Sequence, residues 1–176
     1  FSQSYLIFNL KLKAMQLHKT LLEDVEEDEF GLIALYGDLE GFKMAYLLNK
    51  YLKLQLKRER RDLDFNHKSV KAYYAHYSFK DLKNFRSYHL VANKFKGESQ
   101  KILSAGSLFE EEEVRPLQVN LVPEYKKVDF FLKIDEELNQ KDLNLLVNAI
   151  SQIPQVRAVY KIDTDLLKSK QNLIFE

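Results

Sequence analysis

The sequence predicts an α+β fold, with a mainly antiparallel sheet of about six strands, two main helices and a single pair of layers. Three observations support this prediction. Several short segments alternate apolar and polar residues with a period of two, which is typical of strands. These segments follow one another in runs, which favours antiparallel pairing. Only two segments place apolar residues at helical spacing.

Length and composition indicate one globular domain. The chain has 176 residues, of which 45% are hydrophobic and 30% charged, with 5 Gly and 3 Pro. This composition differs from that of disordered chains. We expect residues 15–176 to form a single α+β domain, because Met15 directly precedes the first patterned segment. Residues 1–14 are interpreted as an upstream extension, and the alternative is a disordered segment or an edge strand.

Two classes of protein are excluded by simple features. The absence of cysteine excludes disulfides, thiolate metal sites and a cysteine nucleophile. No apolar run approaches the roughly 20 residues that a membrane-spanning helix needs. Positive charges at Lys11 and Lys13 follow the first apolar run instead of preceding it, unlike the pattern of a signal peptide. We therefore expect a cytoplasmic protein that has no membrane partner.

The charge is balanced over the whole chain but not along it. The formal net charge is +1, yet residues 43–101 contain 15 Lys and Arg against 5 Asp and Glu. Acidic clusters lie at 23–29 and 110–113. The expected effects are solubility and pairing between the basic middle and the acidic flanks.

The first elements alternate between strand and helix. Residues 30–36 are a short apolar run before Gly37, which predicts a buried strand, and residues 17–23 could pair with it. Asp38 is the expected N-cap of a helix over 39–52. Its apolar stripe is Leu39, Phe42, Ala45, Leu48 and Leu52, widened by Met44, Leu47 and Tyr51. Residues 54–65 alternate apolar and charged side chains, which predicts a twisted or edge strand.

Two strands with clear alternation follow. The strand over 71–79 places Tyr73, Ala75, Tyr77 and Phe79 on one face, and Tyr74 and His76 on the other. The strand over 87–95 places Tyr88, Leu90 and Ala92 opposite His89, Val91 and Phe95. The connection over 80–86 is short, so the two strands are expected to be antiparallel neighbours. Residues 96–115 contain Gly, Ser and a run of four Glu, which predicts a long loop.

The last elements are a strand, a helix and a strand. Residues 128–135 show the strongest alternation, with Val128, Phe130, Leu132 and Ile134 on one face. An amphipathic helix over 143–153 is expected to end before Pro154, and residues 156–162 form the last strand. Residues 163–165 are expected to cap a terminal helical turn.

One segment resembles a known family. Residues 122–130, with the sequence VPEYKKVDF, resemble the signature of the IPExxxVDY family of small uncharacterised proteins that are common in Bacteroidetes. Val122 replaces Ile and Phe130 replaces Tyr, and the region over 38–49 is also similar to the family's N-terminal half. The resemblance implies a bacterial cytoplasmic protein with one domain. It implies no activity, substrate or catalytic residue.

The motif supplies the candidate binding residues Glu124, Tyr125 and Asp129. In one interpretation the motif is structural: Pro123 begins a turn that sets the register of the next strand, and both carboxylates are solvated or paired. In the other, Glu124 and Asp129 line a ligand groove beside Tyr125. The sequence leaves both interpretations open.

The sequence identifies no catalytic residue, and we expect no metal and no cofactor. The four histidines, His18, His67, His76 and His89, lack metal-ligand spacing. His76 and His89 become cross-strand neighbours if the predicted hairpin forms, and together with Glu124 they would form a conceivable acid–base or metal cluster. Motifs for a serine nucleophile or for nucleotide phosphates are missing.

Three hypotheses for function follow. The first is a protein-interaction or binding module without catalysis, whose partner is another protein or a second copy of the chain. The alternative is a single-stranded nucleic-acid-binding protein that uses the basic stretch 53–61 and the aromatic strand 73–77. Its candidate residues are Lys57, Arg58, Arg60, Arg61, Tyr73 and Tyr77. A weaker alternative is an enzyme that uses Glu124 and Asp129 with a histidine.

Overall fold

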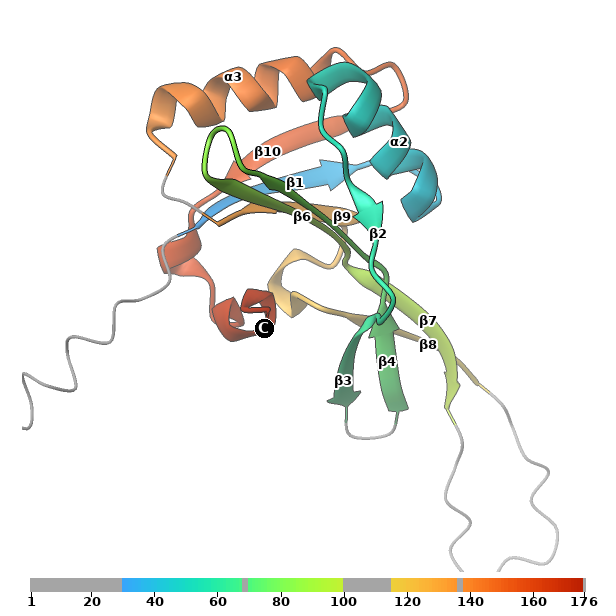
Figure 1. Ribbon diagram of the computed structural model, residues 1–176. Helices are drawn as coiled ribbons and strands as arrows, with labels where there is room; N and C mark the ends of the chain where they lie inside the picture. Colours follow the sequence, from blue (N-terminus) through green and yellow to red (C-terminus); the bar gives the residue numbers. More distant parts are fainter. Residues whose placement is uncertain (1–29, 68–69, 100–114, 136–137, 176) are drawn as a thin grey trace, which may run out of the picture.

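The computed structural model describes residues 30–67, 70–99, 115–135 and 138–175. Its main feature is a six-stranded sheet in the order β10-β1-β9-β6-β5-β2, in which all neighbours are antiparallel (Figure 1). The strands are β1 (Gly31–Tyr36), β2 (Lys57–Arg58), β5 (His76–Asp81), β6 (Arg86–Ala92), β9 (Phe130–Ile134) and β10 (Ala158–Ile162). Together with two helices, this sheet confirms the predicted α+β class.

Two hairpins stand apart from the main sheet. One pairs β3 (Leu63–His67) with β4 (Val70–Tyr74), and the other pairs β7 (Lys94–Ser99) with β8 (Arg115–Asn120). Both extend away from the helices (Figure 1). The hairpins therefore form a separate end of the molecule, opposite the helical layer.

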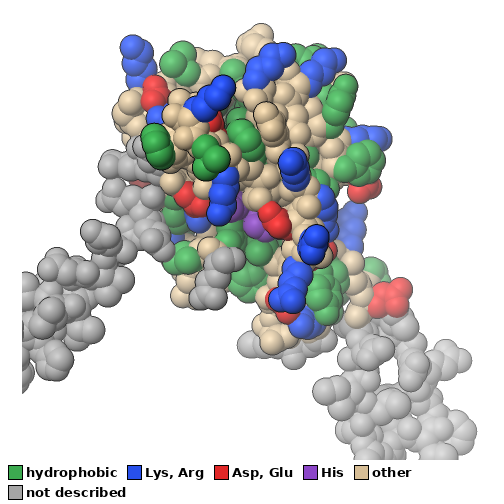
Figure 2. All heavy atoms as spheres, viewed as in Figure 1, with side chains coloured by type: hydrophobic (Ala, Val, Ile, Leu, Met, Phe, Trp, Pro, Cys, Tyr) green, Lys and Arg blue, Asp and Glu red, His purple; other side chains and the backbone are tan. Residues whose placement is uncertain are grey.

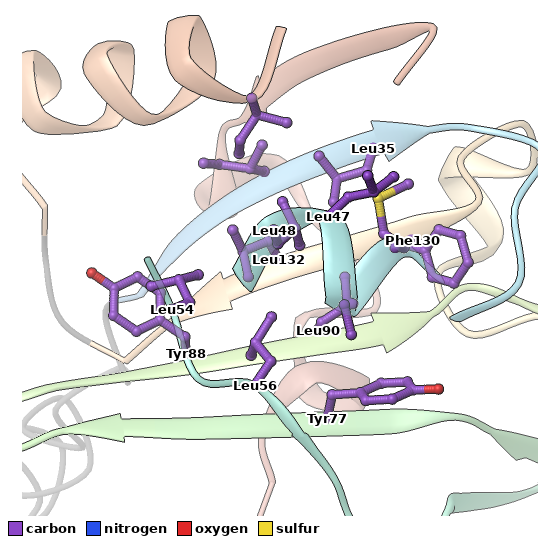
Figure 3. Close-up of a cluster of buried hydrophobic side chains, with 14 of the residues drawn as sticks. Leu35, Leu47, Leu48, Leu54, Leu56, Tyr77, Tyr88, Leu90, Phe130 and Leu132 are labelled. Carbon is purple, nitrogen blue, oxygen red and sulfur yellow. The ribbon is translucent and has the colours of Figure 1, made fainter. Parts of the chain in front are cut away.

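The two helices cover one face of the main sheet. They are α2 (Gly41–Leu52) and α3 (Gln140–Ser151) (Figure 1). Strand residues such as Ile33, Leu90 and Leu132 pack there against Leu48 of α2 and Ile150 of α3, and all five are fully buried. Figure 3 shows Leu48, Leu90 and Leu132 in this cluster. Full burial of one such side chain contributes about 1.5–3 kcal/mol. The predicted pair of helix and sheet layers is thus present.

Short segments cover the second face of the sheet. They are the 3-10 turns η1 (Pro123–Tyr125), η2 (Thr164–Leu166) and η3 (Lys170–Leu173). Leu121 before η1, Leu167 after η2 and Leu173 of η3 join Leu32 and Phe131 of the sheet in a second buried cluster. Because both faces are covered, β9 is buried along its whole length, including the residues predicted to face away from the main core.

Helix α2 differs from the prediction at its start and in its exposed residues. Glu40, not Asp38, occupies the N-cap position, and its side chain makes no capping bond. The chain first makes a tight turn in which Leu39 N donates to Gly37 O, so that the Asp38 side chain stays in solvent. Buried positions are Met44, Ala45, Leu47 and Leu48, whereas Phe42 and Tyr51 are exposed. The contact stripe is narrower than predicted.

Three predicted strands are divided in the structure. The segment 71–79 splits into β4 and β5, which belong to different sheets, and 87–95 splits at Asn93 into β6 and β7. Within 54–65, only β2 joins the main sheet, because β3 pairs with β4. The predicted faces are nevertheless confirmed, since Tyr77 and Leu90 lie in the helix-side cluster, and Tyr74 and Val91 in the second one.

The remaining predictions have mixed outcomes. Helix α3 ends before Pro154 as predicted, and the side chain of Asp163 accepts from Asp165 N at the start of η2. Strands β7 and β8 occupy both ends of the predicted loop 96–115, because residues 94–99 pair with 115–120. The predictions for 1–14, for 17–23 and for the middle of that loop lie outside the described residues.

Candidate functional site

One buried asparagine side chain forms hydrogen bonds to the motif segment, residues 122–130. Asn93 is fully buried, and its Nδ2 donates to Tyr125 O at 2.8 Å and to Val128 O at 3.0 Å. Its Oδ1 accepts from Val122 N at 2.9 Å. The side chain therefore satisfies three backbone groups at the turn that contains Pro123. This clamp fixes where the motif's own carboxylates lie.

Glu124 attaches the C-terminal segment to the motif. Its carboxylate accepts from Ser169 N at 2.8 Å and from Ser169 Oγ at 2.7 Å. Partial burial opposes ionisation, but these hydrogen bonds prevail and lower the pKa of Glu124. The neighbouring Tyr125 ring packs edge-on against Phe131 at 6.3 Å. Both residues thus make contacts within the chain.

Asp129 lies at a different place from Glu124. Its Oδ2 accepts from Gly37 N at 2.9 Å, and its Oδ1 contacts Lys94 Nζ at 2.5 Å. The carboxylate connects the end of β1, the start of β7 and the residue before β9. The groove predicted to contain Glu124, Tyr125 and Asp129 together is therefore not formed: among the three, only Asp129 lines the hollow described next.

A hollow of about 560 Å³ opens beside the first turn of α2. Its lining comes from the segment before α2 and the first turn of α2, from β4 and residues next to β3 and β4, from β6 and β7, and from the motif. These residues are Gly37, Asp38, Leu39, Glu40, Gly41, Lys43, Asp62, Tyr73, Ala75, Ala92, Lys94, Lys96, Asp129 and Phe130. Lys94 is paired with Asp129, and Asp62 is paired with Arg58. The described residues form no ion pair with Lys43, Lys96 or Glu40.

The outward face of α2 continues this hollow. Phe42 is 59% exposed and Tyr46 is 63% exposed, one helical turn apart. Lys43 Nζ lies 5.9 Å from the centre of the Phe42 ring, and it also lines the hollow. No Asp or Glu occurs between Gly41 and Leu52. Figure 2 shows hydrophobic and basic side chains side by side over this part of the molecule.

Some residues of the nucleic-acid hypothesis are exposed to solvent and others are buried. Lys57, Arg60 and Arg61 are exposed, and Tyr73 is 49% exposed within the hollow. Tyr77, by contrast, is only 8% exposed because it faces the helix-side core. This corrects the prediction that Tyr77 belongs to a surface for stacking bases.

Arg58 is committed to neighbours within the chain. Its guanidinium forms an ion pair with Asp62, donates to His76 O at 3.2 Å and lies 5.3 Å from the centre of the Tyr77 ring. Among the cations of the nucleic-acid hypothesis, Arg58 therefore makes its contacts within the chain.

The two sheet histidines meet, as predicted for the hairpin. His76 Nε2 lies 3.0 Å from His89 Nδ1, and His89 Nε2 lies 2.8 Å from Asp135 Oδ2. Glu124 does not join the two histidines, because this motif residue is hydrogen-bonded to Ser169. The predicted cluster of His76, His89 and Glu124 is therefore corrected to a chain that ends on Asp135.

Lys133 completes this cluster. It is 5% exposed, its Nζ lies 2.6 Å from Asp135 Oδ1, and it lies 4.9 Å from the ring centres of both Phe30 and Phe175. Burial opposes ionisation of Asp135, but hydrogen bonds from His89 and Lys133 lower its pKa to about 2. Asp135 is therefore a carboxylate at neutral pH.

Burial has the opposite effect on His76. Loss of solvent around the ring, and next the neighbouring His89, lower the pKa of His76 to about 4. The ring is thus neutral at pH 7. Sequence analysis missed Lys133 and Asp135 as partners, although the period of two in 128–135 placed both on the second face. Only the register that pairs His89 with Lys133 brings them together.

Two further findings concern metal binding and membrane spans in the described residues. Among them, no three His, Asp or Glu side chains converge in a way that could hold a metal ion. No helix within 30–67, 70–99, 115–135 and 138–175 is long and apolar enough to cross a membrane.

Comparisons of the chain with protein-family models, with curated proteins and with solved structures give no match.

Proposed function

We propose that the protein is a non-catalytic binding module for polypeptides. Its binding surface is the α2 surface, which we define as Phe42, Lys43, Tyr46 and Lys50 together with the hollow beside the first turn of α2. The observation that carries the proposal is the exposure of Phe42 and Tyr46, at 59% and 63%, on the helix whose first turn lines a hollow of about 560 Å³. Exposed aromatic side chains next to a pocket are typical of binding hot spots.

The charges of the α2 surface favour an acidic partner. Lys43 and Lys50 are the charged residues of α2, and Lys96 adds a cation to the hollow. Glu40 is the one lining carboxylate for which the described residues provide no cation. A peptide with aromatic or aliphatic anchors and acidic flanks would therefore match both the rings and the lysines.

Two observations disfavour the other hypotheses. The predicted catalytic groups are separated, since Glu124 binds Ser169, Asp129 binds Lys94, and the histidines bind Asp135. For the nucleic-acid hypothesis, Tyr77 is buried in the core, so that Tyr73 is the exposed ring of the two candidate tyrosines. Sequence-tolerant binding of single strands depends on several exposed rings along a basic groove.

The test is a selection of random displayed peptides on the immobilised protein, followed by measurement of the selected peptide's affinity by fluorescence anisotropy. We expect peptides that combine aromatic and acidic residues. The double variant Phe42→Ser/Tyr46→Ser should bind at least tenfold more weakly, because both anchors are lost while no buried contact changes. Affinity should also fall as salt rises.

The matched control is Leu166→Ser, which removes a side chain that is 76% exposed on η2, away from the α2 surface. It should leave the affinity within twofold. A 15-nucleotide single-stranded DNA serves as the competing probe. Retention of the oligonucleotide with no peptide selected would overturn the proposal and support the nucleic-acid alternative.

A further inference from the structure

The His76 and His89 rings form an in-line hydrogen bond on the second face of the sheet. Their ring centres are 5.2 Å apart and their planes differ by 24°. This separation is close to the 3.0 Å nitrogen distance plus the two ring radii, so the rings meet edge to edge. Strand register explains this, because Val91 is the direct partner of His76, and His89 is the diagonal neighbour on the same face.

The direction of this hydrogen bond follows from Asp135. A carboxylate only accepts, so His89 Nε2 carries the hydrogen that Asp135 receives. The neutral His89 then has an acceptor at Nδ1, and His76 Nε2 must donate to it. Both rings are neutral in this arrangement. Protonation of His89 at Nδ1 would place two N–H groups against each other.

The C-terminal residues cover the two rings. The Phe175 ring lies 5.0 Å from the His76 ring and 5.5 Å from the His89 ring. Leu173 is the last fully buried residue before Phe175, and Ile174 between them is 48% exposed. Ser169 is bonded to Glu124, and Asn172 Nδ2 donates to Leu121 O. Phe175 therefore lies beyond the attached part of the segment.

The cations around the pair have partners of their own, and the nearby carboxylate of Glu59 only partly offsets the cost of burying a protonated imidazole. From β9, Lys133 pairs with Asp135. From β2, Arg58 pairs with Asp62, and from the residue after β2, Glu59 accepts from Ser78. From η3, Lys170 Nζ lies 5.9 Å from the Phe30 ring centre. A charged imidazole in this cluster has to reach water, because an isolated buried charge is costly.

We propose that the His76–His89 pair is an acid-sensitive latch for the cover formed by residues 174–175: neutral rings hold Phe175 on the sheet, and protonation of His76 releases residues 174–175 while the rest of the fold stays intact. Release gives water access to the imidazoles. It also removes an aromatic ring from Lys133, which keeps its contact with the Phe30 ring. The released state exposes the Phe175 side chain.

The pH at which the latch opens is bounded on both sides. While the cover is closed, the pKa of His76 is held at about 4 by burial and by His89. In the open state the ring is solvated, and its pKa approaches the ordinary value of about 6.5. Opening is therefore favoured as the pH falls from about 6.5 towards 4, and is disfavoured above that range.

A tryptophan at the cover reports on the latch, because the chain contains no other Trp. In Phe175→Trp, we expect the acrylamide quenching constant to rise at least threefold between pH 7.5 and 4.5. The added substitution His76→Phe keeps a ring at this position but removes its titration, so the rise should disappear. The matched control His67→Gln alters a histidine on β3 that contacts Tyr74 instead of the latch, and the rise should persist.

Three results would overturn the latch. They are a quenching constant that stays flat to pH 4.5, an equal rise in the His76→Phe background, and a parallel loss of far-ultraviolet circular dichroism. As a second measurement on the unmodified chain, proton nuclear Overhauser contacts from the Phe175 ring to both histidine rings should be present at pH 7.5 and lost at pH 4.5. Their persistence at pH 4.5 would also contradict the proposal.

Discussion

Replacing Asn93 with alanine is expected to lower the free energy of unfolding by about 4 kcal/mol. The side chain is fully buried and bonds to three backbone groups, namely Val122 N, Tyr125 O and Val128 O. Alanine supplies no partner, so Val122 N and Val128 O lose these bonds in the interior, while Tyr125 O keeps only its bond from Val128 N. Urea denaturation followed by circular dichroism measures the change.

Asn120→Ala is the matched control for this variant. The Asn120 side chain also donates to a backbone carbonyl, that of Lys126 at 3.2 Å, but it does so at the exposed surface. Water replaces the lost partner, so the expected cost is below about 1 kcal/mol. Equal effects of the two substitutions would show that Asn93 is not the clamp of the motif.

Replacing Asp129 with alanine is expected to cost about 3 kcal/mol of unfolding free energy. The substitution leaves the Gly37 N–H without its acceptor and Lys94 without its counter-ion, and the side chains of Asp129 and Lys94 are only 23% and 27% exposed. Asp129→Asn should recover part of the loss, because an amide oxygen can still accept from Gly37. Urea denaturation distinguishes the two variants.

Asp64→Ala provides the comparison for Asp129. Asp64 also pairs with a lysine, Lys71 at 2.6 Å, but both side chains are about half exposed. Exposed ion pairs contribute little to stability, so the urea midpoint should not change. If Asp129→Ala also left the midpoint unchanged, Asp129 would not connect β1, β7 and the motif as described.

The sequence was most informative where one face of an element meets the core continuously. The period of two in β5, β6 and β9 correctly separated Tyr77 and Leu90 from Tyr74 and Val91. It did not show that the strands break at residues 75 and 93, because the alternation continues across both points while the hydrogen-bonding partner changes. Which strand pairs with which is a long-range property that the local pattern does not contain.

The candidate site was less predictable, for two physical reasons. In α2, helical spacing grouped Phe42 with the core residues, but the contact stripe is centred on Met44 and Leu48, so Phe42 faces outward. The histidine pair was anticipated from the hairpin. Its partner Asp135 was not, because it arrives from β9 through a register that only the folded sheet defines.

The central claim is that the α2 surface binds a polypeptide. The most direct test is a titration of the ¹⁵N-labelled protein with the selected acidic, aromatic peptide, in which backbone amide shifts are followed by NMR. We expect shifts to concentrate at residues 37–46 and at 73 and 92–96, which carry Phe42, Tyr46 and the lining of the hollow. Shifts concentrated at residues 57–61, or on the second face around 167–175, with the amides of α2 unchanged, would contradict the account.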